Sequence, residues 1–158
     1  MPTDEARARL AVEQTRLVES LIRQVPPPPG FHVERVRLAA ERLLRKRSQA
    51  LRKSWPVTGA TLGERFDGLF SRYVARRPSA PPGGPLGDGM AFAEWLIAHD
   101  EAPDVIRLEA LRARLGVRCG TGGIRRRRGI RIAFARRASG WPMVMIAWPF
   151  GGRITLVG

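Results

Sequence analysis

Residues 55–96 decide the fold: WPVTGATLGERFDGLFSRYVARRPSAPPGGPLGDGMAFAEWL. Within them, Thr61 and Glu64 stand at capping-box spacing, in which each side chain bonds a backbone donor of the other residue, so we expect a helix to start near Thr61. The apolar residues that follow recur at three- and four-residue spacing, as on one face of a helix: Leu62, Phe66, Leu69, Phe70 and Tyr73.

The second half of this stretch predicts another short helix. Residues 78–89 consist mainly of proline, glycine and small residues, which is typical of a loop. Asp88 is then expected to cap a helix whose apolar residues include Phe92, Trp95 and Leu96. Two short helices held together by aromatic side chains are therefore predicted between residues 55 and 96.

Further helices are predicted on both sides of this stretch. Residues 4–24 and 31–54 carry apolar residues at helical spacing, with Val33, Val36 and Leu43 on the core side of the second helix. Between them, Pro26–Pro29 is interpreted as a stiff spacer in preference to an SH3-type ligand. Pro103–Leu115 predicts a fifth helix, since proline suits the first helical turn.

At Gly116 the pattern changes from helix to strand. Residues 117–124 are glycine-rich and predict a connector or a hairpin loop. Residues 129–138 alternate in a period of two, so Arg131 should project opposite to Ile130 and Ile132. Residues 141–148 and 153–157 predict two more strands, joined by a turn at 149–152.

Taken together, the pattern predicts an α+β fold. A helical domain of about five helices, residues 1–115, is followed by a small antiparallel β-meander, residues 117–158. Because three strands alone are only marginally stable, one face of the meander should pack on the helices.

Charge is distributed unevenly along the chain. The formal net charge is +14, and residues 116–158 hold nine arginines and no acidic residue. Residues 1–115 hold 19 basic and 14 acidic residues. This asymmetry predicts that the C-terminal region meets an acidic protein surface, an acidic peptide or nucleic acid; the alternative is a solvated basic surface without a specific ligand.

The candidate binding residues lie in this region. Guanidinium groups bind carboxylates and phosphates in a forked geometry, and an aromatic ring offers a stacking surface. A strand edge there would also allow a peptide to add by backbone pairing. The predicted partner- or peptide-binding residues are Arg125, Arg126, Arg127, Arg128, Arg131, Arg136, Arg137 and Trp141.

Residues that would support catalysis are sparse. His32 and His99 stand far apart, each at a predicted helix boundary, and do not form a metal-binding spacing. Cys119 is the single cysteine, so an internal disulfide is excluded, and a thiolate nucleophile beside Arg118 is the remaining alternative. The glycines at 120–123 lack the Gly-Lys-Ser/Thr of a phosphate loop. We therefore expect no enzyme activity, no metal and no cofactor.

The chain also lacks features of membrane insertion. It contains no run of about 18 apolar residues, and its charged N-terminus lacks an apolar signal core. These features predict a cytoplasmic protein without a membrane partner.

The middle of the chain resembles a known family over roughly residues 40–115. The resemblance rests on Trp55-Pro56, Leu62-Gly63-Glu64-x-Phe66, Tyr73, Pro78, Gly87 and Phe92-Ala93-x-Trp95-Leu96. These residues resemble the helical domain of a family once labelled DNA-binding, which includes the partner subunit of methanobactin biosynthesis and other proteins that accompany multinuclear non-heme iron oxidases.

The resemblance implies a non-catalytic accessory subunit. Such a subunit binds the oxidase, which holds the iron, and helps it to recognise a ribosomally made precursor peptide. The arginine-rich hairpins are shorter than a full peptide-recognition domain in that family. The older label implies the alternative, a nucleic-acid-binding protein that acts through the arginine-rich C-terminal region.

Overall fold

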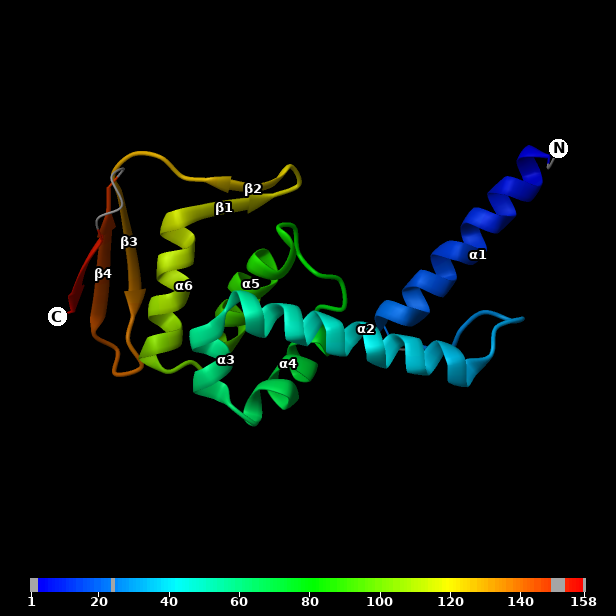
Figure 1. The fold of residues 1–158 in the computed structure, drawn as a ribbon, viewed down its shortest axis with the longest axis horizontal. Coiled ribbons are helices and arrows are strands. Elements are labelled where there is room, and N and C mark those ends of the chain that lie inside the picture. Colours follow the sequence, from blue (N-terminus) through cyan, green and yellow to red (C-terminus); the bar gives the residue numbers. More distant parts are fainter. Residues whose placement is uncertain (1–2, 24, 149–152, 158) are drawn as a thin grey trace.

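The computed structural model describes residues 3–23, 25–148 and 153–157. Within these ranges, helices come first in the chain and strands follow, which confirms the predicted α+β class (Figure 1). The helices are α1 (Asp4–Arg23), α2 (Val33–Ser54), α3 (Pro56–Leu62), α4 (Arg65–Arg76), α5 (Gly84–Ala98) and α6 (Asp104–Gly116). The strands are β1 (Val117–Gly120), β2 (Gly123–Arg126), β3 (Arg131–Arg136), β4 (Pro142–Ala147) and β5 (Arg153–Val157).

Aromatic side chains join α4 to α5, as the sequence predicts. The ring of Phe92 lies 5.5 Å from the rings of both Phe66 and Phe70, measured between centroids. All three side chains are buried, together with Tyr73 and Trp55. Because large aromatic residues dominate the energetics of a core, this cluster is the centre of the helical part.

The predicted capping box at Thr61 is wrong. Thr61 lies in the last turn of α3, and Gly63 ends that helix with a φ of 52°. Glu64 precedes α4 without forming a side-chain cap. The physical reason is Pro56, whose fixed φ suits the first turn of a helix, so a new helix starts directly after Trp55.

The predicted cap at Asp88 is also wrong. The α5 helix begins at Gly84, after Gly83 in the left-handed conformation with a φ of 97°, and Pro85 occupies its first turn. Asp88 therefore lies inside the helix, where its side chain is buried. A buried carboxylate requires a partner, and Arg47 of α2 supplies it.

The α1 helix and the first half of α2 form an arm that projects from the body (Figure 1). Of the described residues of α1, only Ser20 is buried, and Leu10 and Val18 on the predicted apolar stripe are exposed. Val33 and Leu43 are exposed as well, so their predicted place on the core side of α2 is wrong. The part of α2 that enters the core is its second half, through Ser48 and Leu51.

The α6 helix lies between the helical bundle and the sheet. It packs on α3 and α5 and also on β3 and β4, and the sheet has the order β3-β4-β5 with antiparallel pairing. The predicted meander is thus confirmed and packs on a helix. Leu111 and Leu115 of α6 form a second core with Met143, Met145 and Ala147 of β4.

The glycine-rich residues 117–124 contribute to a separate two-stranded hairpin. In it, β1 pairs with β2, with Cys119 opposite Ile124. The predicted turn at 149–152 lies outside the described residues. None of the helices in the described part of the chain combines the length and apolar character needed to cross a bilayer.

Candidate partner-binding surface

Arg125 and Arg126 lie on β2, where antiparallel pairing sets them against β1. Arg125 is directly opposite Arg118, and Arg126 is directly opposite Val117. Both members of the Arg118–Arg125 pair are exposed, and no ion pair links either of them to a described carboxylate. Like charges directly opposite each other destabilise a strand pair. An anionic group bound at this pair would therefore relieve repulsion that the hairpin otherwise carries.

Arg127 holds the hairpin against the end of α6. Its backbone N–H donates to the Gly116 carbonyl over 3.0 Å, and its Nε donates to the Val117 carbonyl over 3.2 Å. Arg128 follows and is exposed. Of the run Arg125–Arg128, Arg127 therefore has an internal structural role, while its neighbours present their charge to solvent.

Arg131 projects opposite to Ile132, as predicted, but its side chain lies on the face of β3 that carries Ala133 and Ala135 and packs on α6. It is half-buried at the start of β3, opposite Ala147. Its Nε and Nη1 atoms are shielded from solvent and donate to no acceptor among the described residues. Arg131 is thus not part of an open basic surface, although the sequence places it among the candidate residues.

Arg136, Arg137 and Trp141 lie at the β3–β4 turn, near the start of α6. Arg136 is exposed, and Trp141 is 64% exposed. The Nε of Arg137 donates to Asp104 Oδ2 over 2.8 Å, and the Ala138 N–H donates to Asp104 Oδ1 over 2.7 Å. These two hydrogen bonds, the backbone one foremost, lower the pKa of Asp104. Arg137 is therefore used to fasten the sheet to α6.

The predicted site residues that remain exposed fall into two groups. One group surrounds the β1–β2 hairpin at the C-terminal end of α6, and the other, Arg136 with Trp141, lies at its N-terminal end (Figure 1). A helix of this length separates them by about 18 Å. Arg118 belongs to the first group and was missed, because only the strand pairing brings it opposite Arg125.

Cys119 and the two histidines lie on separate elements: Cys119 on β1, His32 before α2 and His99 after α5. Cys119 lies against Gly83, and burial raises the pKa of its thiol, which lowers the thiolate fraction at neutral pH. His32 and His99 flank α2 and α5, as expected, and the His99 ring stacks on Trp95 at 4.3 Å. No group of three or more metal-ligating side chains converges within the described ranges.

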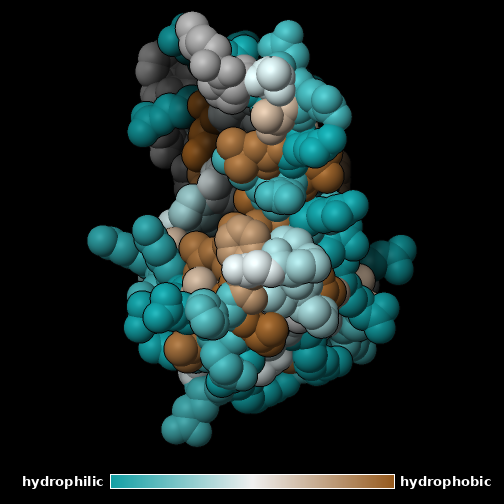
Figure 2. All heavy atoms as spheres, turned by 90° about the vertical axis from the view of Figure 1, so that its right-hand side faces the viewer, coloured by the Kyte–Doolittle hydropathy of each residue, from teal (hydrophilic) through white to brown (hydrophobic). Residues whose placement is uncertain are grey.

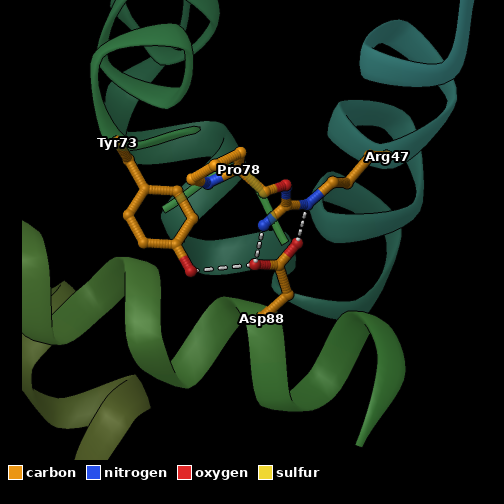
Figure 3. A network of polar contacts seen from close by, with 4 residues as sticks. All are labelled: Arg47, Tyr73, Pro78 and Asp88. Atoms are coloured by element: carbon orange, nitrogen blue, oxygen red, sulfur yellow. Dashed lines mark hydrogen bonds and ion pairs between the residues drawn. The ribbon is translucent and has the colours of Figure 1, made fainter. Parts of the chain in front are cut away.

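The helical part contains a polar network around the buried Asp88 (Figure 3). Arg47 donates to both carboxylate oxygens, through Nε over 2.7 Å and Nη2 over 2.8 Å. The Tyr73 hydroxyl donates to Asp88 Oδ1 over 2.9 Å, and Arg47 Nη1 donates to the Pro78 carbonyl over 2.7 Å. Burial, and next the Asp88 charge, raise the pKa of Tyr73. Since its members satisfy one another, the network joins α2, α4 and α5 and is structural.

A hollow of about 320 Å³ lies where α1 and the prolines meet α2. Val25, Val33 and Val36 line it together with an exposed ion pair between Arg37 and Glu41. Figure 2 shows this side of the molecule, where apolar patches alternate with polar side chains. The hollow has no concentration of charge and no converging polar groups.

Comparison with known proteins places the helical part in a family. Residues 11–98, which span most of α1 and extend to the end of α5, match the family model described as "SCO6045-like, C-terminal domain". A UPF0276 protein of Streptomyces avermitilis is 32% identical over 111 residues, which are 70% of this chain and 22% of the relative. No solved structure matches. The chain spans about a fifth of the length of this curated relative, and it belongs to the SCO6045-like C-terminal domain family.

Proposed function

We propose that this chain is a non-catalytic accessory module that binds a multinuclear non-heme iron oxidase and its ribosomally made precursor peptide during peptide natural-product modification. The observation that carries the proposal is the size of the match. The similar segment makes up 22% of a longer relative, so in that protein a module of this kind accompanies a much larger polypeptide. The identity of the oxidase comes from the resemblance of residues 40–115.

The surface of the C-terminal region supports this proposal. The β1–β2 hairpin carries exposed arginines that form no ion pair with a described carboxylate: Arg118, Arg125 and Arg126. Such groups bind carboxylates of a protein or peptide in forked geometry. They also steer the approach of an acidic partner and select against basic ones.

Co-purification tests the proposal. The tagged chain is purified from its native cells, and iron is measured in the protein that accompanies it. The hairpin variant carries two substitutions, Arg125→Glu and Arg126→Glu. The control variant carries Arg16→Glu and Arg76→Glu. The four residues are exposed and join no described ion pair, so both variants change the net charge equally.

We expect an iron-containing partner that the hairpin variant no longer retains and the control variant does. Arg131 is unsuitable for this test because its guanidinium is shielded, so reversal of its charge would disturb folding. Equal retention by both variants, or the absence of an iron protein, would contradict the proposal.

The second candidate function is nucleic-acid binding. Besides the C-terminal arginines, α2 presents Arg42, Arg45, Lys46 and Lys53, all exposed. Each phosphate contact releases counterions, so this function requires affinity that falls steeply with salt. A mobility-shift titration with duplex and single-stranded DNA measures it, and absence of retardation at low salt removes this candidate.

A further inference from the structure

We infer that the outer face of strands β3 and β4 is a docking surface for a protein surface with an apolar centre and carboxylates at its ends. This inference deepens the proposed function, on which it rests, by assigning the face of this chain that meets the partner. The inference rests on large apolar side chains of β3 that point away from α6 and are exposed.

Strand register defines the outer face. Ile132 is directly opposite Ile146, and Phe134 is directly opposite Val144, so these four side chains share one face. Ile132 is 55% exposed and Phe134 is 70% exposed. Ile130, just before the strand, is 74% exposed. Val144 and Ile146 of β4 are half-buried, so the apolar residues of this face that are most open to water are those of β3 and Ile130 before it.

The inner face is also apolar, but α6 covers it. Ala133 and Ala135 of β3 pack with Met143, Met145 and Ala147 of β4 against α6. Small residues let the helix approach the sheet, and they leave the β-branched and aromatic residues on the side away from it. A shift of one residue in the strand register would exchange the two faces. An exposed apolar face of this kind marks an interaction site.

The arginines beside the apolar row indicate which kind of partner binds there. Arg136 alternates with Ile132 and Phe134 and so continues the same face, and it is exposed. Arg128 is exposed just before Ile130, at the other end of the apolar row. Neither arginine joins an ion pair with a described carboxylate. An apolar row with an arginine at each end fits a partner with the opposite charges at its ends.

A second copy of this chain is a poor occupant for the same reason. Residues 116–158 carry nine arginines and no acidic residue, so two such faces would bring like charges together. Nucleic acid is a poor occupant of an apolar face, because its outer surface is polyanionic.

Photo-crosslinking in native cells tests the inference. The photoreactive phenylalanine analogue p-benzoylphenylalanine replaces Phe134 in the full chain, and the crosslinked residues of the partner are mapped by mass spectrometry. The control carries the same analogue in place of Val12, which is 51% exposed on α1. We expect Phe134 adducts on a protein segment in which apolar residues are flanked by Asp or Glu, and we expect Arg136→Glu to lower their yield about fivefold.

A second variant tests the apolar contact without the analogue. Phe134→Thr keeps a residue with high strand propensity at an exposed position, so folding is expected to persist, with circular dichroism as the check. Retention of the mapped partner should fall by at least about tenfold, as for an apolar contact removed from an interface. Adducts with a second copy, with nucleic acid or with a basic segment would overturn the inference, as would unchanged retention by Phe134→Thr.

The outcomes separate this inference from the proposed function. An iron oxidase that co-purifies but is neither crosslinked from position 134 nor released by Phe134→Thr would overturn the inference alone. Adducts with an acidic, apolar segment of a protein that holds no iron would support the docking face and count against the oxidase.

Discussion

At the residue scale, the Arg47–Asp88 pair is a buried contact that should be costly to disrupt. Asp88 is 1% exposed and receives both ends of the guanidinium fork. Removing one partner leaves the other buried without compensation. Asp88→Asn should therefore lower the free energy of unfolding by about 3–5 kcal/mol in urea titration.

Asp67→Asn is the matched control for Asp88→Asn. Its side chain is 69% exposed and pairs with Arg52 at the surface, so the expected loss is below about 1 kcal/mol. Equal effects of the two substitutions would contradict a special role for Asp88.

Tyr73 gives the same network a pH dependence. Burial raises the pKa of Tyr73 in the folded chain, so the unfolded chain releases this proton first, from about pH 10 upward. Its contribution to stability is complete below pH 10 and is lost as the pH rises toward the folded pKa. Because the chain has a single tyrosine, Tyr73→Phe should remove this component from unfolding curves measured between pH 8 and pH 11. An unchanged pH profile would contradict the assignment.

Gly89 sets the distance between α5 and Trp55. A Cβ at this position would lie 1.9 Å from Trp55 Nε1, within a fully packed site. Gly89→Ala should lower the free energy of unfolding by about 1–3 kcal/mol, since the indole must move. Gly68→Ala in α4 is the control: nothing lies within 4 Å of its Cβ, and alanine is expected to stabilise that helix by about 0.4–1 kcal/mol. Thermal unfolding of both variants checks the difference in sign.

At the scale of elements, α3 depends on a cap supplied by another helix. Glu109 of α6 accepts hydrogen bonds from the backbone N–H groups of Val57 and Thr58, over 3.1 and 2.7 Å, and from the Thr58 hydroxyl over 2.6 Å. A carboxylate at a helix N-terminus satisfies orphan donors and complements the dipole. Glu109→Ala should therefore cost about 1–2 kcal/mol, against little for the exposed Glu94→Ala. Equal losses in denaturant titrations would contradict the cap.

Elements were predictable from the sequence where the deciding interactions are local. The helices on either side of residues 24–32, the aromatic contact between α4 and α5, and the meander all follow from periodicity and from proline and glycine positions. Asp88 was misassigned as a cap because its partner Arg47 lies 41 positions away in the chain. Local spacing carries no information about such a pair.

The candidate surface also depends on contacts between distant residues, which local spacing does not reveal. The alternation in β3 indicates two faces, but which face is buried depends on α6, which packs Ala133 and Ala135 inward and leaves Ile132 and Phe134 outside. Likewise, Arg137 belongs to the basic run in the sequence, yet Asp104 on a different element engages it. The sequence therefore identifies the basic region but does not separate its exposed arginines from those that hold the structure together.

At the scale of the whole molecule, α6 connects a helical part with charges of both signs to strands that carry arginines and no acidic residue. The family match ends at residue 98, whereas the arginine-rich strands follow α6. Hydrogen bonds from Arg107 to the Arg136 carbonyl and from Arg137 to Asp104 hold the sheet on this helix. A partner bound at the strands would therefore be held in a fixed orientation to the helical family domain.

Hydrogen–deuterium exchange of the full chain, alone and with its co-purified partner, shows which surface the partner covers. We predict slower backbone exchange in residues 117–147 when the partner is bound, with the aromatic core of α4 and α5 unchanged. Protection confined to α1 and α2, with the strands exchanging as in the free chain, would contradict it.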